Sequence, residues 1–220
     1  MFGKTLLIGE SCYWGCSTAD KSCRPFDKDR VYRFDSWLDV YALTYKDAIR
    51  HGFNTLDLRE IPETKSWTTL ALHLVQDFIE QGGYRLYPSK VVISRDLHTI
   101  QHLTIKHSWR NMGTGYLPNN TPKWNYKYKP AFALIDKEVK VIKYWIDENA
   151  EPSTWTKQGK EYAYSLNIAA HDFQKGEYTL AVAIIDRNKK DKPSINLAIT
   201  NHKLDNGWYL ASSLLIQYAI

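Results

Sequence analysis

Residues 5–10 read Thr5-Leu6-Leu7-Ile8-Gly9-Glu10, an apolar run that ends on a carboxylate. The pattern predicts a buried β-strand. A helix is expected to follow from the cap at Asp35 or Ser36 to Arg50, because apolar residues recur on one face at helical spacing. The order β-α-β-α then continues with a strand over residues 53–58 and a helix from Ser66 to the stop at Gly82-Gly83. Such alternation predicts parallel strands joined by right-handed crossovers.

Beyond residue 87 the period of the apolar residues changes to two. Leu103, Ile105, His107 and Trp109 alternate with polar residues. Further strands are expected between turn signals; these are Ala131–Asp136, Val139–Ile146, Glu161–Ala169, Tyr178–Asp186, Ile195–Thr200 and Trp208–Ile216. The fold class predicted is therefore α+β, with two β/α units in residues 1–87 and an antiparallel β-sandwich of Ig-like or jelly-roll type in residues 88–220.

The composition of the chain argues against some classes of function. The net charge of +5 comes from 29 basic and 24 acidic residues that are scattered along the chain, which argues against nucleic acid as a partner. No apolar run is long enough to cross a membrane, and no signal-peptide core is present, so the localisation stays open. The 8 Trp and 15 Tyr are many for this length, and aromatic faces serve both cores and sugar-binding surfaces.

The three cysteines fall in one loop. Cys12, Cys16 and Cys23 have a C-x3-C-x6-C spacing that matches zinc sites poorly, with no histidine nearby in sequence. One disulfide with an odd thiol, or three free thiols, are the alternatives. Since no nucleophile-elbow, phosphate-binding or dinucleotide motif occurs either, neither a metal nor a cofactor is expected.

The chain contains a set of short motifs, which are Gly9-Glu10 before Tyr13-Trp14, the run Leu56-Asp57-Leu58-Arg59, the join Gly82-Gly83-Tyr84-Arg85-Leu86, Trp109-Arg110-Asn111 with Gly113, and Asn206-Gly207-Trp208-Tyr209. As a set they resemble the bacterial DUF4832 proteins. That resemblance covers nearly the whole chain, and implies the last part of a glycoside-hydrolase-like TIM barrel followed by a β-sandwich.

The resemblance also implies roles for particular residues. Residues 5–10 resemble barrel strand seven and residues 53–59 strand eight. Glu10 then matches the nucleophilic carboxylate of a retaining glycosidase, whereas the strand that carries the acid/base carboxylate has no counterpart in this chain. From the sequence alone, Glu10 is equally a strand-end carboxylate that pairs with a cation such as Arg59.

Other residues around Glu10 are candidate substrate contacts. Asp57 and Arg59 fall on one face of their strand because side chains alternate, and they either contact substrate or pair with each other. Tyr13, Trp14 and Trp67 are candidates for a sugar subsite, with packing in the helix core as the alternative for Trp67. The loop from Met112 to Pro130, with Tyr116, Trp124 and Tyr126, either binds carbohydrate or seals a domain interface.

These patterns predict the C-terminal part of a glycoside-hydrolase-like protein that acts on or binds an oligosaccharide or polysaccharide, inactive alone. A non-catalytic carbohydrate-binding or accessory sandwich module is the alternative. Carbohydrate is the expected partner, without nucleic acid or membrane. A preceding barrel segment, or another copy of the chain, is expected to cover the open strand edges.

Overall fold

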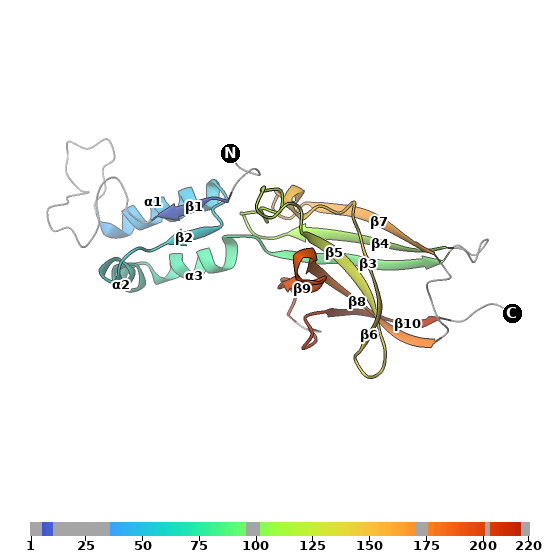
Figure 1. The fold of residues 1–220 in the computed structure, drawn as a ribbon. Coiled ribbons are helices and arrows are strands. Elements are labelled where there is room, and N and C mark those ends of the chain that lie inside the picture. Colours follow the sequence, from blue (N-terminus) through green and yellow to red (C-terminus); the bar gives the residue numbers. More distant parts are fainter. Residues whose placement is uncertain (1–5, 11–35, 96–101, 170–175, 201–202, 217–220) are drawn as a thin grey trace. The chain divides into compact units, whose positions relative to one another are not determined.

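The computed structural model describes residues 6–10, 36–95, 102–169, 176–200 and 203–216. The fold is mixed α+β, with few helices and mostly antiparallel sheets (Figure 1). The chain forms two compact units: the first contains residues 1–84 and 112–117, and the second residues 85–111 and 118–220. The division falls after Tyr84 rather than after Tyr87, and the short segment 112–117 returns to the first unit.

The first unit contains two short parallel strands and three helices in the order β-α-β-α-α: β1 Ile8–Glu10, α1 Trp37–Arg50, β2 Thr55–Asp57, α2 Ile61–Leu70 and α3 Leu72–Gln81. The predicted β-α-β-α order holds, except that two helices stand where one was expected. Strand β1 pairs with β2 in parallel, as predicted, and Glu10 lies opposite Asp57. The N-cap of α1 is also confirmed, because Ser36 Oγ accepts a hydrogen bond from the N–H of Asp39.

The second helical stretch differs from the prediction. Helix α2 begins at Ile61 rather than Ser66, and Pro62 stands in its first turn, where a missing N–H costs no hydrogen bond. The path then bends at Ala71 before α3. Buried residues of α1, α2 and α3 form one core, which consists of Val40, Tyr41, Trp67, Ala71 and Leu74.

The segment 112–117 closes over the end of α3 within the first unit. The N–H of Gly115 donates to Gly83 O at 2.7 Å, and the Asn54 amide donates to Tyr116 O at 2.8 Å. Gly83 has a φ of +65°, and a Cβ added at Gly115 would lie 3.0 Å from the Gly83 backbone. Glycine is favoured at Gly83 by the positive φ, and at Gly115 by the close approach of the two backbones.

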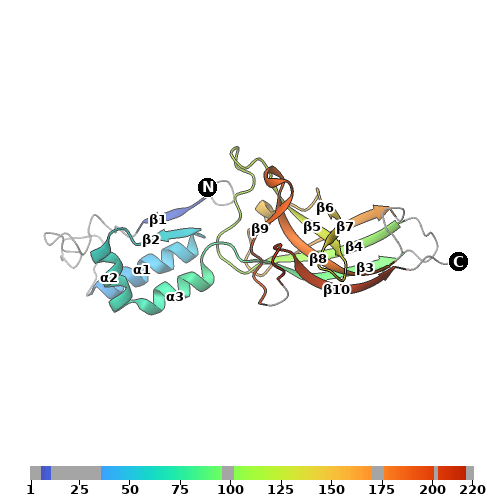
Figure 2. The same ribbon diagram turned by 60° about the horizontal axis from the view of Figure 1, so that its bottom comes forward.

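The second unit holds two antiparallel sheets (Figures 1 and 2). One has the order β3-β4-β7, from β3 Leu86–Arg95, β4 His102–Asn111 and β7 Glu161–Ala169. The other sheet has the order β10-β8-β5-β6, and β9 also pairs with β8. Its strands are β5 Tyr128–Ile135, β6 Val141–Ile146, β8 Gly176–Asp186, β9 Lys192–Ile195 and β10 Tyr209–Ile216. The strand predicted at Ile195–Thr200 is therefore wrong in position, and β3 was not predicted.

Contacts between the two sheets come from residues that alternate along the strands. The ring of His107 on β4 lies 4.7 Å from that of Phe132 on β5. On the opposite face of β5 and β8 the side chains are mostly alanine, and Trp208 packs against them. Strand β5 is buried on both faces because it is central in its sheet and covered on each side.

Candidate functional site

The C-terminal ends of β1 and β2 bring two carboxylates together. Glu10 and Asp57 are partners in the parallel register, on strands that lie about 4.8 Å apart in a sheet. Because side chains alternate, both point to the same face, which Ile8 and Thr55 share. The opposite face carries buried Gly9 and Leu56, which packs against the helical core.

Arg59 joins this pair of carboxylates. Its Nε lies 3.5 Å from Glu10 Oε1, and its backbone N–H donates to Asp57 Oδ1 at 2.7 Å. The turn depends on a left-handed conformation at Arg59, with φ of 57°, which is disfavoured for a residue with a Cβ. The hydrogen bond to Asp57 holds the turn and directs the guanidinium toward Glu10.

This group is open to solvent. The side chains of Glu10 and Arg59 are 65% and 34% exposed, and an ion pair so exposed stabilises a fold by only about 0–1 kcal/mol. The contact therefore adds little to folding. It leaves two carboxylates and a guanidinium accessible to a solute, an arrangement that can bind sugar hydroxyls or a substrate carboxylate.

The other predicted residues do not all join this group. Trp67 is 1% exposed and stacks on Tyr41 with ring centroids 4.3 Å apart. This position corrects the prediction that Trp67 lines a sugar subsite: the ring belongs to the helical core. Tyr13 and Trp14 lie outside the described residues, as do the three cysteines.

One buried carboxylate was missed. Glu63 is fully buried in α2, although charged side chains on a short connection are usually exposed. It lies four residues before Trp67, and residues at this spacing share one face of a helix. The predicted start of the helix at Ser66 hid that relation.

The second unit contains a buried chain of three polar side chains. Trp109 Nε1–H donates to His107 Nδ1 at 2.8 Å, and an indole nitrogen can only donate. The ring proton of His107 is therefore on Nε2, which donates to Asp147 Oδ2 at 2.8 Å. Burial by itself would raise the pKa of Asp147, but hydrogen bonds from His107 and from the backbone N–H of Asn149 outweigh it and lower that pKa.

The histidine and the aspartate are both fully buried, at 0% side-chain exposure. Their place between the sheets gives no access to a substrate, so they stabilise the second unit rather than form a reaction centre. His107 shares the face of Ile105 and Trp109, in agreement with the two-residue period of the sequence, and both of those residues are buried.

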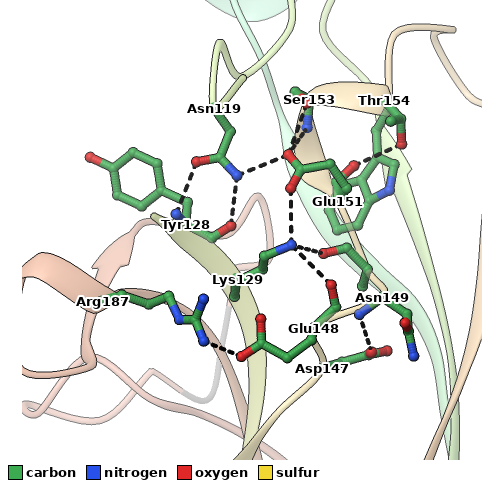
Figure 3. A network of polar contacts seen from close by, with 12 residues as sticks. Asn119, Tyr128, Lys129, Asp147, Glu148, Asn149, Glu151, Ser153, Thr154 and Arg187 are labelled. Carbon is green, nitrogen blue, oxygen red and sulfur yellow. Dashed lines mark hydrogen bonds and ion pairs between the residues drawn. The ribbon is translucent and has the colours of Figure 1, made fainter. Parts of the chain in front are cut away.

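A second buried network connects the loops next to β5 (Figure 3). Lys129 Nζ pairs with Glu151 Oε2 at 3.1 Å and donates to the carbonyl of Glu148 at 3.0 Å. The other oxygen of Glu151 accepts from the Asn119 amide at 2.9 Å and from the Ser153 hydroxyl at 2.8 Å. Each charged atom has partners of opposite polarity, which is the condition for a buried ion pair to be tolerated.

Within the described ranges, no three His, Cys, Asp or Glu side chains are grouped as a metal ion would need. In the same part of the chain, no helix has the length and apolar character to cross a membrane.

Comparison with known proteins gives little. No family model matches the chain, and neither does any curated protein. Among solved structures, β-glucosidase 3B from Thermotoga neapolitana in complex with glucose aligns at a TM-score of 0.28 and 14% identity, over 46% of this chain and 14% of that chain. Its complexes with glycerol and with α-D-glucose align over the same shares at 15% identity. A TM-score this low does not show a shared fold.

Proposed function

We propose that the first unit is the end of a glycoside-hydrolase-type (β/α)8 barrel, and that the second unit is a β-sandwich attached to it. The observation that supports this most is the parallel register of β1 and β2, which brings Glu10 and Asp57 to one face at the C-terminal edge beside Arg59. Catalytic groups of such barrels occupy that edge. The motifs shared with the DUF4832 proteins favour the same assignment.

In this proposal Glu10 is the nucleophile. A retaining glycosidase needs a carboxylate that attacks the anomeric carbon, and the exposed side chain of Glu10 is accessible to a sugar. Asp57 accepts a hydrogen bond from a sugar hydroxyl, and Arg59 keeps Glu10 oriented. The second carboxyl group of the mechanism must lie about 5–5.5 Å away, and we assign it to a further barrel strand that has no counterpart in this chain.

Further β/α units would pair with the open edges of β1 and β2, either from a preceding segment or from another copy of the chain. Without the acid/base carboxylate the chain alone is expected to hydrolyse glycosides poorly. A sugar with a leaving group that needs no protonation avoids this requirement, and allows the nucleophile to be tested by itself.

The test is therefore covalent trapping with 2-deoxy-2-fluoroglycosyl fluorides of several common hexoses. A carboxylate oxygen of Glu10 forms a bond to C1 as the C1–F bond breaks and fluoride leaves. Peptide mass spectrometry should find one glycosyl ester, on the peptide that contains residue 10. Glu10→Gln should abolish the adduct, whereas Glu60→Gln, a change at an exposed carboxylate nearby, should leave it intact. Absence of any adduct, or labelling that persists in Glu10→Gln, would refute the assignment.

A further inference from the structure

In the second unit, the loop 118–128 presents aromatic rings to solvent. Tyr126 is 47% exposed, and Trp124 and Tyr128 are half-buried. Trp109 on β4 and Tyr116 in the first unit, which precede the loop in the sequence, are fully buried. The rings of the loop itself are therefore accessible to a solute, unlike these two.

The backbone of this loop is held in a disfavoured conformation. Asn125 and Tyr126 both have positive φ, at 44° and 57°, and neither is glycine. Two hydrogen bonds keep the turn: Tyr126 N–H donates to Asn119 O at 2.8 Å, and Asn125 N–H donates to Thr121 O at 2.8 Å. Such conformations persist only where the surroundings over-determine them, and they are common at ligand sites.

The surroundings here are the buried network described above (Figure 3). The side chain of Asn119, a fully buried residue, accepts from Tyr128 N–H at 2.9 Å and donates to Tyr128 O at 2.8 Å. Its amide also donates to Glu151, which is paired with Lys129. The exposed rings therefore stand on a rigid base, and a preorganised surface loses less entropy when a ligand binds.

The polar groups beside the rings restrict the kind of ligand. Lys127 Nζ lies 4.5 Å from the centroid of Tyr128 and 5.5 Å from that of Trp124, and it donates to Asp186 at 2.9 Å. The hydrogen bond to Asp186 raises the pKa of Lys127, so the amine stays cationic. A cationic ligand would be repelled by this ammonium group. An anionic one gains little, because Asp186 balances the charge.

We propose that the loop 118–128 is a carbohydrate-binding surface, on which a neutral sugar ring stacks against Tyr126 and Trp124 and a hydroxyl accepts a hydrogen bond from Lys127. An uncharged molecule with an apolar C–H face and several hydroxyls suits exposed rings next to a neutralised ammonium group. This site lies in the second unit and does not require Glu10. It would hold a polysaccharide whether or not the first unit is catalytic.

The test is affinity gel electrophoresis in neutral polysaccharides, namely mixed-linkage β-glucan, xylan and soluble starch, followed by calorimetric titration with a hexasaccharide of whichever one retards the protein. Trp124→Ala and Tyr126→Ala should each weaken binding about tenfold, as expected when a sugar covers on the order of 60 Å² of ring surface. Trp124→Phe and Tyr126→Phe keep a ring and should largely restore binding. Tyr144→Ala is the matched control, because Tyr144 on β6 is 40% exposed.

Binding that survives both alanine changes would overturn the proposal, as would an equal loss in Tyr144→Ala. Failure of all three polysaccharides to retard the protein would overturn it too. Covalent labelling of Glu10 and retardation by polysaccharide are separate measurements, so this site and the proposed nucleophile succeed or fail separately. If Trp124→Ala unfolds, Tyr126→Ala still decides, because the Tyr126 side chain is 47% exposed and is not part of the core.

Discussion

Replacing Lys129 with methionine should destabilise the second unit strongly. The side chains of Lys129 and Glu151 are only 8% and 16% exposed, and the ammonium group bonds three acceptors: Glu151 Oε2 at 3.1 Å and the carbonyls of Glu148 at 3.0 Å and Ala150 at 3.5 Å. Methionine has a similar length and fills the same space. The change therefore removes the charge and its hydrogen bonds but leaves no large cavity.

The expected loss follows from what remains buried. Removing one partner of a buried ion pair costs about 3–5 kcal/mol, because the other charge is left uncompensated. Glu151 keeps hydrogen bonds from Asn119 and Ser153 through its other oxygen, so we expect the lower end, about 3 kcal/mol. In a protein of this size that corresponds to a fall in Tm of roughly 6–12 °C.

Calorimetry together with urea denaturation measures both quantities. The matched control is Lys137→Met, which breaks the ion pair between Lys137 and Glu177, where the side chains are 75% and 64% exposed. Exposed pairs contribute little, so this variant should melt as the native chain does. If Lys129→Met lowered Tm no more than Lys137→Met, our account of the network in Figure 3 would be wrong.

Two further outcomes are expected in the second unit. The pKa of Asp147 is lowered on folding from its ordinary value of 3.8. Its contribution to stability is therefore present above that value and disappears as the pH falls through the folded-state pKa. Asp147→Asn should lose less stability between pH 6 and pH 3 than the native chain, and equal losses would contradict this reasoning. Lys190 has φ of 54°, where asparagine is better tolerated, so Lys190→Asn should raise the free energy of unfolding by roughly 0.5–1 kcal/mol, whereas Lys189→Asn, at an exposed neighbour in the short helix Arg187–Lys189, should not raise it.

The sequence predicted an element correctly where several local signals, such as a capping residue and the apolar spacing, agreed. Helix α1 has both a capping serine and regular apolar spacing, and it begins where the cap indicates. The bend at Ala71 was not predictable in this way: alanine favours helix, and the apolar spacing continues across it. The sequence placed Trp67 at the start of a helix, with packing in the helix core as one alternative, whereas α2 begins at Ile61 and holds Trp67 in its second half.

Strand β3 was missed for a different reason. Pro88 interrupts its sequence, and proline usually argues against a central strand. Here β3 is the edge of its sheet, and the register shifts between Pro88 and Lys90. The missing N–H of Pro88 therefore removes no hydrogen bond between neighbouring strands. Only the strand order, which the sequence does not contain, reveals that proline is acceptable at this position.

The contacts in the candidate sites also differ in whether the sequence could predict them. The contact of Glu10 with Arg59 was considered from the sequence, because the β-α-β order predicts two parallel strands whose C-terminal ends meet at one edge of the sheet. The pairs His107 with Asp147 and Lys129 with Glu151 join residues far apart in the sequence, and no local pattern predicts them. Buried polar groups must find partners, but which partners they find depends on how the sheets and loops pack.

The aromatic residues show why function here is harder to predict than fold. Composition cannot separate rings that fill a core from rings that bind a ligand. The structure buries Trp67, Trp109 and Trp155 but leaves Tyr126 and Tyr144 partly exposed. Tyr144 lies on a regular strand and donates its hydroxyl to Asp191 at 2.8 Å. Tyr126 instead has a disfavoured backbone conformation, which is held by the hydrogen bond from its N–H to Asn119 O. Positive φ alone does not mark a binding site, since Lys190 has it too. Tyr126 differs from Tyr144 because it lies beside Trp124 and the neutralised Lys127, and it is there that we expect a sugar.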